Sequence, residues 1–126
     1  MPLIRTDYNP ELFTSGMIRD YKGRLLERVA ERLGKKIADI SVFSAAYESV
    51  DDSVMAAEVL AQIGKGLAEK RYPFRDRDMS GSIAPTGLEA VEHSLLVATR
   101  EFKIEHGVEQ GILVATQVCD WQVRVA

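Results

Sequence analysis

The segment LGKKIADISV, at residues 33–42, recurs in outline as HGVEQGILV, at residues 106–114. In each segment a glycine follows a helical pattern, and a polar turn then leads into an apolar run that is typical of a strand. Glycine directly after an amphipathic pattern indicates a helix C-terminal cap. The two segments therefore predict two equivalent junctions, each joining a helix to a strand.

An amphipathic pattern precedes each of these glycines. In the first, from Glu11 to Leu33, charged residues mostly occupy the face opposite a stripe with a four-residue spacing: Phe13, Met17, Tyr21, Leu25, Val29 and Leu33. In the second, Thr86 can cap a helix whose stripe is Leu88, Val91, Leu95, Ala98 and Phe102. We expect two helices that each lie on an apolar surface.

Strands are predicted at Leu3 to Asp7, at 40–43, and from Ile112 toward Trp121. The segment 54–63 is ambiguous, because its apolar residues fit both helical spacing and strand alternation, and its alanines slightly favour a helix. A helix through Ala68 would give three helices on a three-stranded sheet. A strand would complete a doubled β-α-β unit.

The doubled unit predicts an α+β fold: a four-stranded mixed sheet with two helices on one face, since crossovers between parallel strands are right-handed. The 126 residues fit a single domain, with halves at about 1–50 and 54–126 and an insertion at 66–85. The sheet face without helices would be too apolar for water, so we expect oligomers.

Composition excludes several classes of function. The net charge is −3 and no Lys/Arg cluster is dense, so neither nucleic acid nor a membrane surface is the expected partner. The single cysteine, Cys119, allows no internal disulfide and fits a cytoplasmic location. Two histidines and one cysteine give no metal-ligand spacing, and no phosphate-binding loop is present, so no metal or cofactor is expected.

Pro2 is the first candidate for chemistry. Removal of Met1 would give Pro2 a secondary amine at the start of the first strand. Burial disfavours the charged form of an amine, and an amine with a pKa near the working pH is a good proton shuttle. Retention of Met1 would make this nitrogen an amide, with no basicity.

A Met-Pro start on a doubled β-α-β unit resembles the tautomerase superfamily, which includes 4-oxalocrotonate tautomerase and macrophage migration inhibitory factor. The resemblance rests on Pro2, on Leu33-Gly34-Lys35, on Gln62-Ile63-Gly64-Lys65 and on Trp121. It implies that 54–63 is the third strand, and that three copies form a trimer whose sites at the N-termini are shared between subunits.

The activity implied is that of a cofactor-free isomerase acting on a small 2-oxo or enol acid, with Pro2 as the general base. Hydratase, dehalogenase or decarboxylase chemistry on the same scaffold is a close variant. A different class stays open: a non-catalytic α+β oligomer that binds a small ligand or a protein, which the long insertion and a retained Met1 would favour.

The resemblance also gives substrate-binding candidates. Lys35 and Lys65 match cationic positions of the family, and Ile63 would supply a pocket wall or a backbone amide. The alternatives are a lysine favoured by the helix dipole for Lys35 and a surface lysine for Lys65.

Three further candidates lie outside these motifs. Arg75 and Arg77 could bind anions from the insertion, which could itself be a lid, a subunit contact or a solvated loop. Trp121 could wall the pocket, or pack in the core or at a subunit interface. His93 and His106 are expected to be solvated or structural.

Overall fold

The computed structural model describes residues 2–46, 56–72 and 84–119. The elements in chain order are β1 (Leu3–Tyr8), α1 (Ser15–Leu33), the 3-10 turn η1 (Ile37–Asp39), β2 (Ser41–Ala46), β3 (Ala57–Gly64), α2 (Lys65–Glu69), α3 (Gly87–His106) and β4 (Ile112–Cys119). The strands form one sheet in the order β2-β1-β3-β4. The β1–β2 and β3–β4 pairs are parallel, and the central β1–β3 pair is antiparallel.

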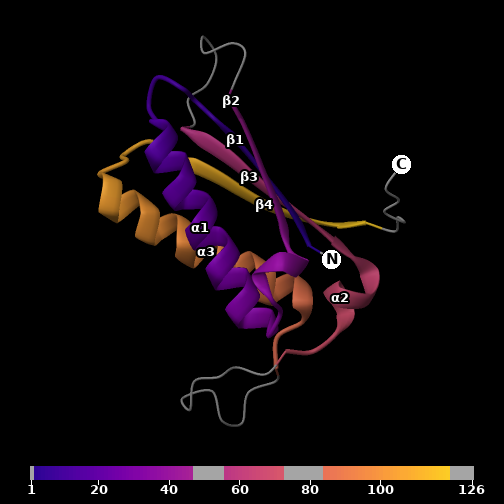
Figure 1. The fold of residues 1–126 in the computed structure, drawn as a ribbon. Coiled ribbons are helices and arrows are strands. Elements are labelled where there is room, and N and C mark those ends of the chain that lie inside the picture. Colours follow the sequence, from indigo (N-terminus) through magenta and orange to yellow (C-terminus); the bar gives the residue numbers. More distant parts are fainter. Residues whose placement is uncertain (1, 47–55, 73–83, 120–126) are drawn as a thin grey trace, which may run out of the picture.

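The two long helices lie side by side on one face of this sheet (Figure 1). The predicted α+β class, with a mixed four-stranded sheet and both helices on one face, is confirmed. Both glycine junctions are confirmed as well, because Gly34 and Gly107 each end a helix with a φ of 64°. This left-handed conformation is easily reached only by glycine.

The ambiguous third segment is a strand, so the prediction of a helix through Ala68 is wrong. Only the five residues of α2, after the strand, are helical. Along β3, Ala57, Val59, Ala61 and Ile63 are buried, whereas the residues between them are more exposed. This alternation packs one strand face against the helices, which overrides the helix propensity of the alanines.

The first helix begins at Ser15, four residues later than the predicted start at Glu11. The Asn9 side chain accepts a hydrogen bond from the Glu11 amide at 2.9 Å, and the Asn9 carbonyl accepts from the Leu12 and Phe13 amides. These bonds form a turn that ends before Thr14, whose hydroxyl accepts from the Met17 amide and caps the helix. Phe13 is still buried, although it precedes the helix.

The core between the helices is centred on Tyr21 of α1 and Phe102 of α3. Their rings stack with centroids 4.3 Å apart, and the Tyr21 hydroxyl shares a 2.6 Å hydrogen bond with the Thr99 hydroxyl. Burial raises the pKa of the Tyr21 hydroxyl, and the bond to Thr99 opposes this shift. The polar atom of a large core residue is thus satisfied inside the core.

The opposite face of the sheet is more polar than the sequence pattern predicted. Arg5 and Asp7 form an ion pair there at 3.1 Å, and Gln62 donates a hydrogen bond to Gln117 at 3.3 Å. Leu113, 49% exposed, is an apolar member of the same face. The described part of this face therefore carries both polar and apolar residues. Among the described helices, none is long and apolar enough to cross a membrane.

Candidate active site

Pro2 lies at one end of the sheet, with its ring fully buried. Its carbonyl accepts a hydrogen bond from the Ser41 amide at 3.2 Å, which continues the β1–β2 ladder. Leu3 pairs with Ser41 on one side and with Gln62 on the other. One residue further along this register, Pro2 lies beside Ile40 and Ile63, both buried.

The surroundings of Pro2 are therefore apolar on both neighbouring strands. An apolar site gives the protonated, charged form of an amine little hydration. Burial there therefore lowers the pKa of an amine. Ile40 is a neighbour of Pro2 that the sequence reasoning did not identify. Its place at the start of the second predicted strand was the available signal, because two parallel strands begin at the same sheet edge.

Two predicted cations follow elements that end at this edge. Lys35 is half-buried directly after the cap of α1, and its amide donates to the Ala30 carbonyl at 2.9 Å. Lys65 is exposed as the first residue of α2, two positions after Ile63. Neither ammonium group has a hydrogen-bonded or ion-paired partner among the described residues. In Figure 1 the N-terminus, α2 and the end of α1 lie at the same end of the molecule.

The predicted insertion begins with α2 and then forms a short stem. The Tyr72 amide donates to the Pro85 carbonyl and the Gly87 amide donates to the Lys70 carbonyl, each at 2.8 Å. Arg71 bridges the same two segments through the Ala84 carbonyl, also at 2.8 Å. The predicted anion-binding residues Arg75 and Arg77 lie outside the described residues, as does Trp121.

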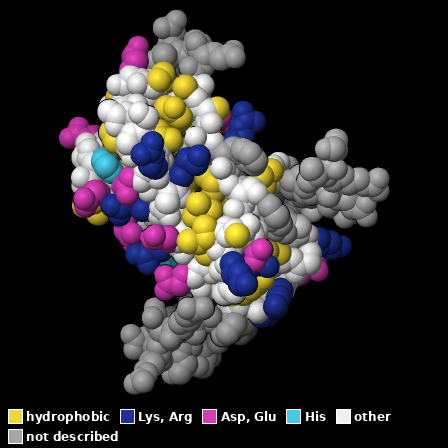
Figure 2. All heavy atoms as spheres, in the orientation of Figure 1, with side chains coloured by type: hydrophobic (Ala, Val, Ile, Leu, Met, Phe, Trp, Pro, Cys, Tyr) yellow, Lys and Arg dark blue, Asp and Glu magenta, His cyan; other side chains and the backbone are white. Residues whose placement is uncertain are grey.

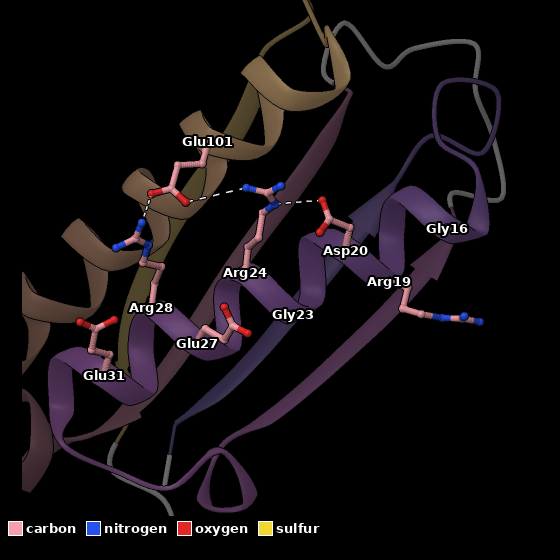
Figure 3. Close-up of a pocket in the computed structure, with 9 residues that line it drawn as sticks. All are labelled: Gly16, Arg19, Asp20, Gly23, Arg24, Glu27, Arg28, Glu31 and Glu101. Carbon is pink, nitrogen blue, oxygen red and sulfur yellow. Dashed lines mark hydrogen bonds and ion pairs between the residues drawn. The ribbon is translucent and has the colours of Figure 1, made fainter.

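A second polar region lies on the outer side of α1 and α3, away from the sheet. Figure 2 shows acidic and basic side chains gathered over these helices, and Figure 3 shows the open groove that they line. Arg24 contacts Asp20 at 2.9 Å and Glu101 at 3.8 Å, and Arg28 also pairs with Glu101. His106 Nε2 lies 2.7 Å from Asp20 Oδ2, so this histidine is structural, while His93 is exposed.

The charges of this groove mainly neutralise one another. The hydrogen bond with His106, and then that with Arg24, lowers the pKa of the Asp20 carboxyl. The hydrogen bond to Asp20 raises the pKa of Arg24. A carboxylate whose pKa is lowered by such hydrogen bonds is a poor proton acceptor. Asp20 is therefore not an activated base, and the groove residues lie on the helices, whereas Pro2 directly precedes β1.

Comparison with known proteins relates the chain to others by structure only. No family model matches it, and no curated protein matches it in sequence. A macrophage migration inhibitory factor-like protein from Entamoeba histolytica superposes with a TM-score of 0.62 and 12% identity, over 98% of this chain and 95% of that one.

Two other similar structures have named activities or assemblies. Malonate semialdehyde decarboxylase gives a TM-score of 0.56 at 14% identity, over 98% of this chain and 91% of that one. A fused 4-OT symmetric trimer gives 0.55 at 15% identity, over 94% and 85%. These structural similarities extend over nearly the whole chain. Because the sequence identities are between 12% and 15%, the similarities establish the fold alone. The resemblance predicted from the sequence is thus confirmed for the architecture, and the chain has the fold of the tautomerase superfamily.

Proposed function

We propose that this chain is a cofactor-free tautomerase-type enzyme whose base is the amine of Pro2 after removal of Met1. The observation that carries the proposal is the place of Pro2: it is fully buried, at a sheet end, with Ile40 and Ile63 as register neighbours. The fold supports it, because one structural neighbour is a decarboxylase described with decarboxylase and hydratase activities and with a proline-to-alanine variant.

The proposed step moves one proton on a small 2-oxo acid. The Pro2 nitrogen takes a proton from the carbon next to the carbonyl, the C–H electron pair becomes a carbon–carbon double bond, and the carbonyl oxygen gains a proton as the enol forms. The π electrons of the carbonyl move onto its oxygen, and water supplies the proton that the oxygen gains. In the reverse direction, the protonated amine returns its proton to carbon, water takes the enol O–H proton, and the carbonyl forms again. A base held in position contributes about 10²- to 10⁴-fold to such a rate.

Lysine side chains near Pro2, at the same end of the sheet, are proposed to bind the substrate. We assign the substrate carboxylate to Lys35 and Lys65, because both ammonium groups are free of partners in the described part of the chain. Ile63, buried beside Pro2, would form the apolar wall of the pocket. Arg75, Arg77 and Trp121 keep the substrate-binding roles proposed for them from the sequence.

We further propose that the working form is a homotrimer. Structures described as 4-OT trimers share this fold, and Leu113 is an exposed large apolar residue on the sheet face that carries no helices. A neighbouring copy would cover this surface and complete the pocket at Pro2.

The decisive experiment follows ketonisation of phenylenolpyruvate by the wild-type protein and by Pro2→Ala, with each N-terminus checked by intact mass. Alanine, like proline, is small enough for Met1 to be removed, so both proteins have a free N-terminus of matched length. A loss of about 10²-fold or more in Pro2→Ala supports proline as the base. Equal rates in proteins that have both lost Met1 would contradict a catalytic role for Pro2. Retained Met1 in an inactive protein would favour the alternative, a non-catalytic oligomer that binds a small ligand or a protein.

A further inference from the structure

The outer face of α1 is defined here as Gly16, Arg19, Asp20, Gly23, Glu27 and Glu31, all of which line the groove in Figure 3. These residues point away from the core, because the buried positions of the helix are Ile18, Tyr21, Leu25, Val29, Ala30 and Leu33. This face belongs to the helical layer, whereas Pro2 and the sheet face proposed for trimer contacts belong to the other. Any interface here is therefore separate from the proposed active site.

The charges on this face differ in how they are paired. Asp20 is paired with Arg24 and His106 within the chain. Arg19, Glu27 and Glu31 are exposed, and none of their side chains has a hydrogen-bonded or ion-paired partner within the described part of the chain. In Figure 3 the Arg19 side chain extends away from the ion-pair network. The face thus has a free cation toward the start of α1 and two free anions toward its end.

These free charges are arranged evenly about Gly23. Arg19 precedes it by four residues, slightly more than one turn, and Glu27 follows it by four. A Cβ at Gly23 would meet no described atom within 4 Å outside the helix's own backbone, so the contacts of this chain do not require glycine there. Glycine inside a helix costs conformational entropy. Because Gly23 has no side chain, the surface of the outer face is less raised at its centre than on either side.

We propose that this face docks against the same face of a second copy, with the two α1 helices antiparallel and a two-fold axis passing near Gly23. Antiparallel alignment brings Arg19 opposite Glu27 of the partner subunit, and the symmetry makes this ion pair twice. Glu31 adds negative charge near the same cation. The helix dipoles oppose each other in this arrangement, and a face that meets itself across a two-fold axis forms a closed contact.

The test uses charge-reversed variants whose faces are no longer self-complementary. Arg19→Glu makes the free charges of the face all negative, and the pair Glu27→Arg with Glu31→Arg makes them all positive. Sedimentation velocity at low salt measures the mass of each assembly against protein concentration. For the wild type we expect an approach to about twice the mass of the unit that the sheet contacts form, and a loss of this doubling at about 1 M salt.

Each variant alone should lose the doubling, whereas an equimolar mixture should regain it, because an all-negative face complements an all-positive one. Glu92→Arg, on the exposed side of α3, is the control for net charge and should behave as the wild type. Circular dichroism of each variant checks that it is folded. The proposal would be overturned if the mass of the wild-type assembly did not double with increasing protein concentration. It would also be overturned if the equimolar mixture of the two variants showed no doubling. Neither result depends on the proposed catalytic role of Pro2.

Discussion

The edge of the sheet at Pro2 and the outer side of the helices are stabilised by opposite kinds of contact. At the sheet edge, Pro2 is buried beside Ile40 and Ile63, and the side chains of the nearby Lys35 and Lys65 have no partner among residues 2–46, 56–72 and 84–119. On the helices, Arg24 and Arg28 are paired with acidic residues of α1 and α3. The charges of the first region are available for a ligand, whereas Arg24 and Arg28 of the second region are paired within the chain.

This difference indicates where chemistry can be found in the fold. An ion pair whose partners are exposed contributes little to stability, about 0 to 1 kcal/mol, because water screens it. Close steric packing and burial at the sheet edge contribute more per residue, so substitutions there should have the larger effects.

The largest effect on stability is expected at Gly87, where the stem of the insertion meets α2. A Cβ at this position would lie 1.8 Å from the backbone oxygen of Leu67, so the backbone itself must move. We expect Gly87→Ala to lower the free energy of unfolding by about 3 kcal/mol, measured by urea denaturation. Gly66→Ala in α2, where a Cβ meets no described atom within 4 Å, is the matched control and should be neutral or stabilising.

A smaller effect, on substrate binding, is expected at Lys35. Lys35→Met removes the ammonium group and keeps much of the apolar stem, so KM for a 2-oxo acid should rise about tenfold through loss of a charged hydrogen bond. Lys36→Met is the control, because Lys36 is exposed and precedes the turn η1. Equal changes in the two variants would indicate a general loss of positive charge instead of a specific contact.

The helix ends and the buried stripe of α1 were more predictable from the sequence than the ion pairs between the helices. The two glycine caps and the four-residue stripe of α1 depend on local spacing, and a sequence displays local spacing directly. The α1–α3 ion pairs could not be predicted, because Glu101 lies 73 residues from Arg28 and only the folded chain brings them together. The late start of α1 depends on a side-chain bond from Asn9 that the helical pattern conceals, although Asn9-Pro10 is a known turn signal.

Within the helix pair, a modest effect is expected from the buried hydroxyl of Tyr21. Tyr21→Phe keeps the ring stacked on Phe102 but removes the hydrogen bond to Thr99, whose hydroxyl still donates to the Leu95 carbonyl at 2.7 Å. We expect a loss of about 1 kcal/mol in the free energy of unfolding. Tyr8→Phe should change it by less than about 0.5 kcal/mol, because the Tyr8 hydroxyl has no hydrogen bond to another described residue. Similar losses in both variants would contradict a specific role for the Tyr21–Thr99 bond.

The smallest effect is expected from Asp20, at the centre of the helix ion pairs. Its pKa is lowered from 3.8, first by the hydrogen bond with His106 and then by that with Arg24. A carboxyl whose folded-state pKa is lowered contributes stability that is present above its unfolded pKa and is lost as the pH falls through its folded pKa. Because the side chain is 38% exposed, we expect Asp20→Asn to cost less than about 1 kcal/mol near pH 5.

That cost should shrink as the pH falls below the unfolded-state pKa of Asp20 and through its lower folded-state pKa, where the wild-type carboxyl becomes protonated and resembles the amide of the variant. Urea denaturation of both proteins across this range measures the difference directly. Glu92→Gln, an exposed carboxylate on α3, is the control. A cost that is independent of pH would mean that Asp20 acts through its shape and neutral hydrogen bonds, and the helix surface would then differ less from the sheet edge than its charges suggest.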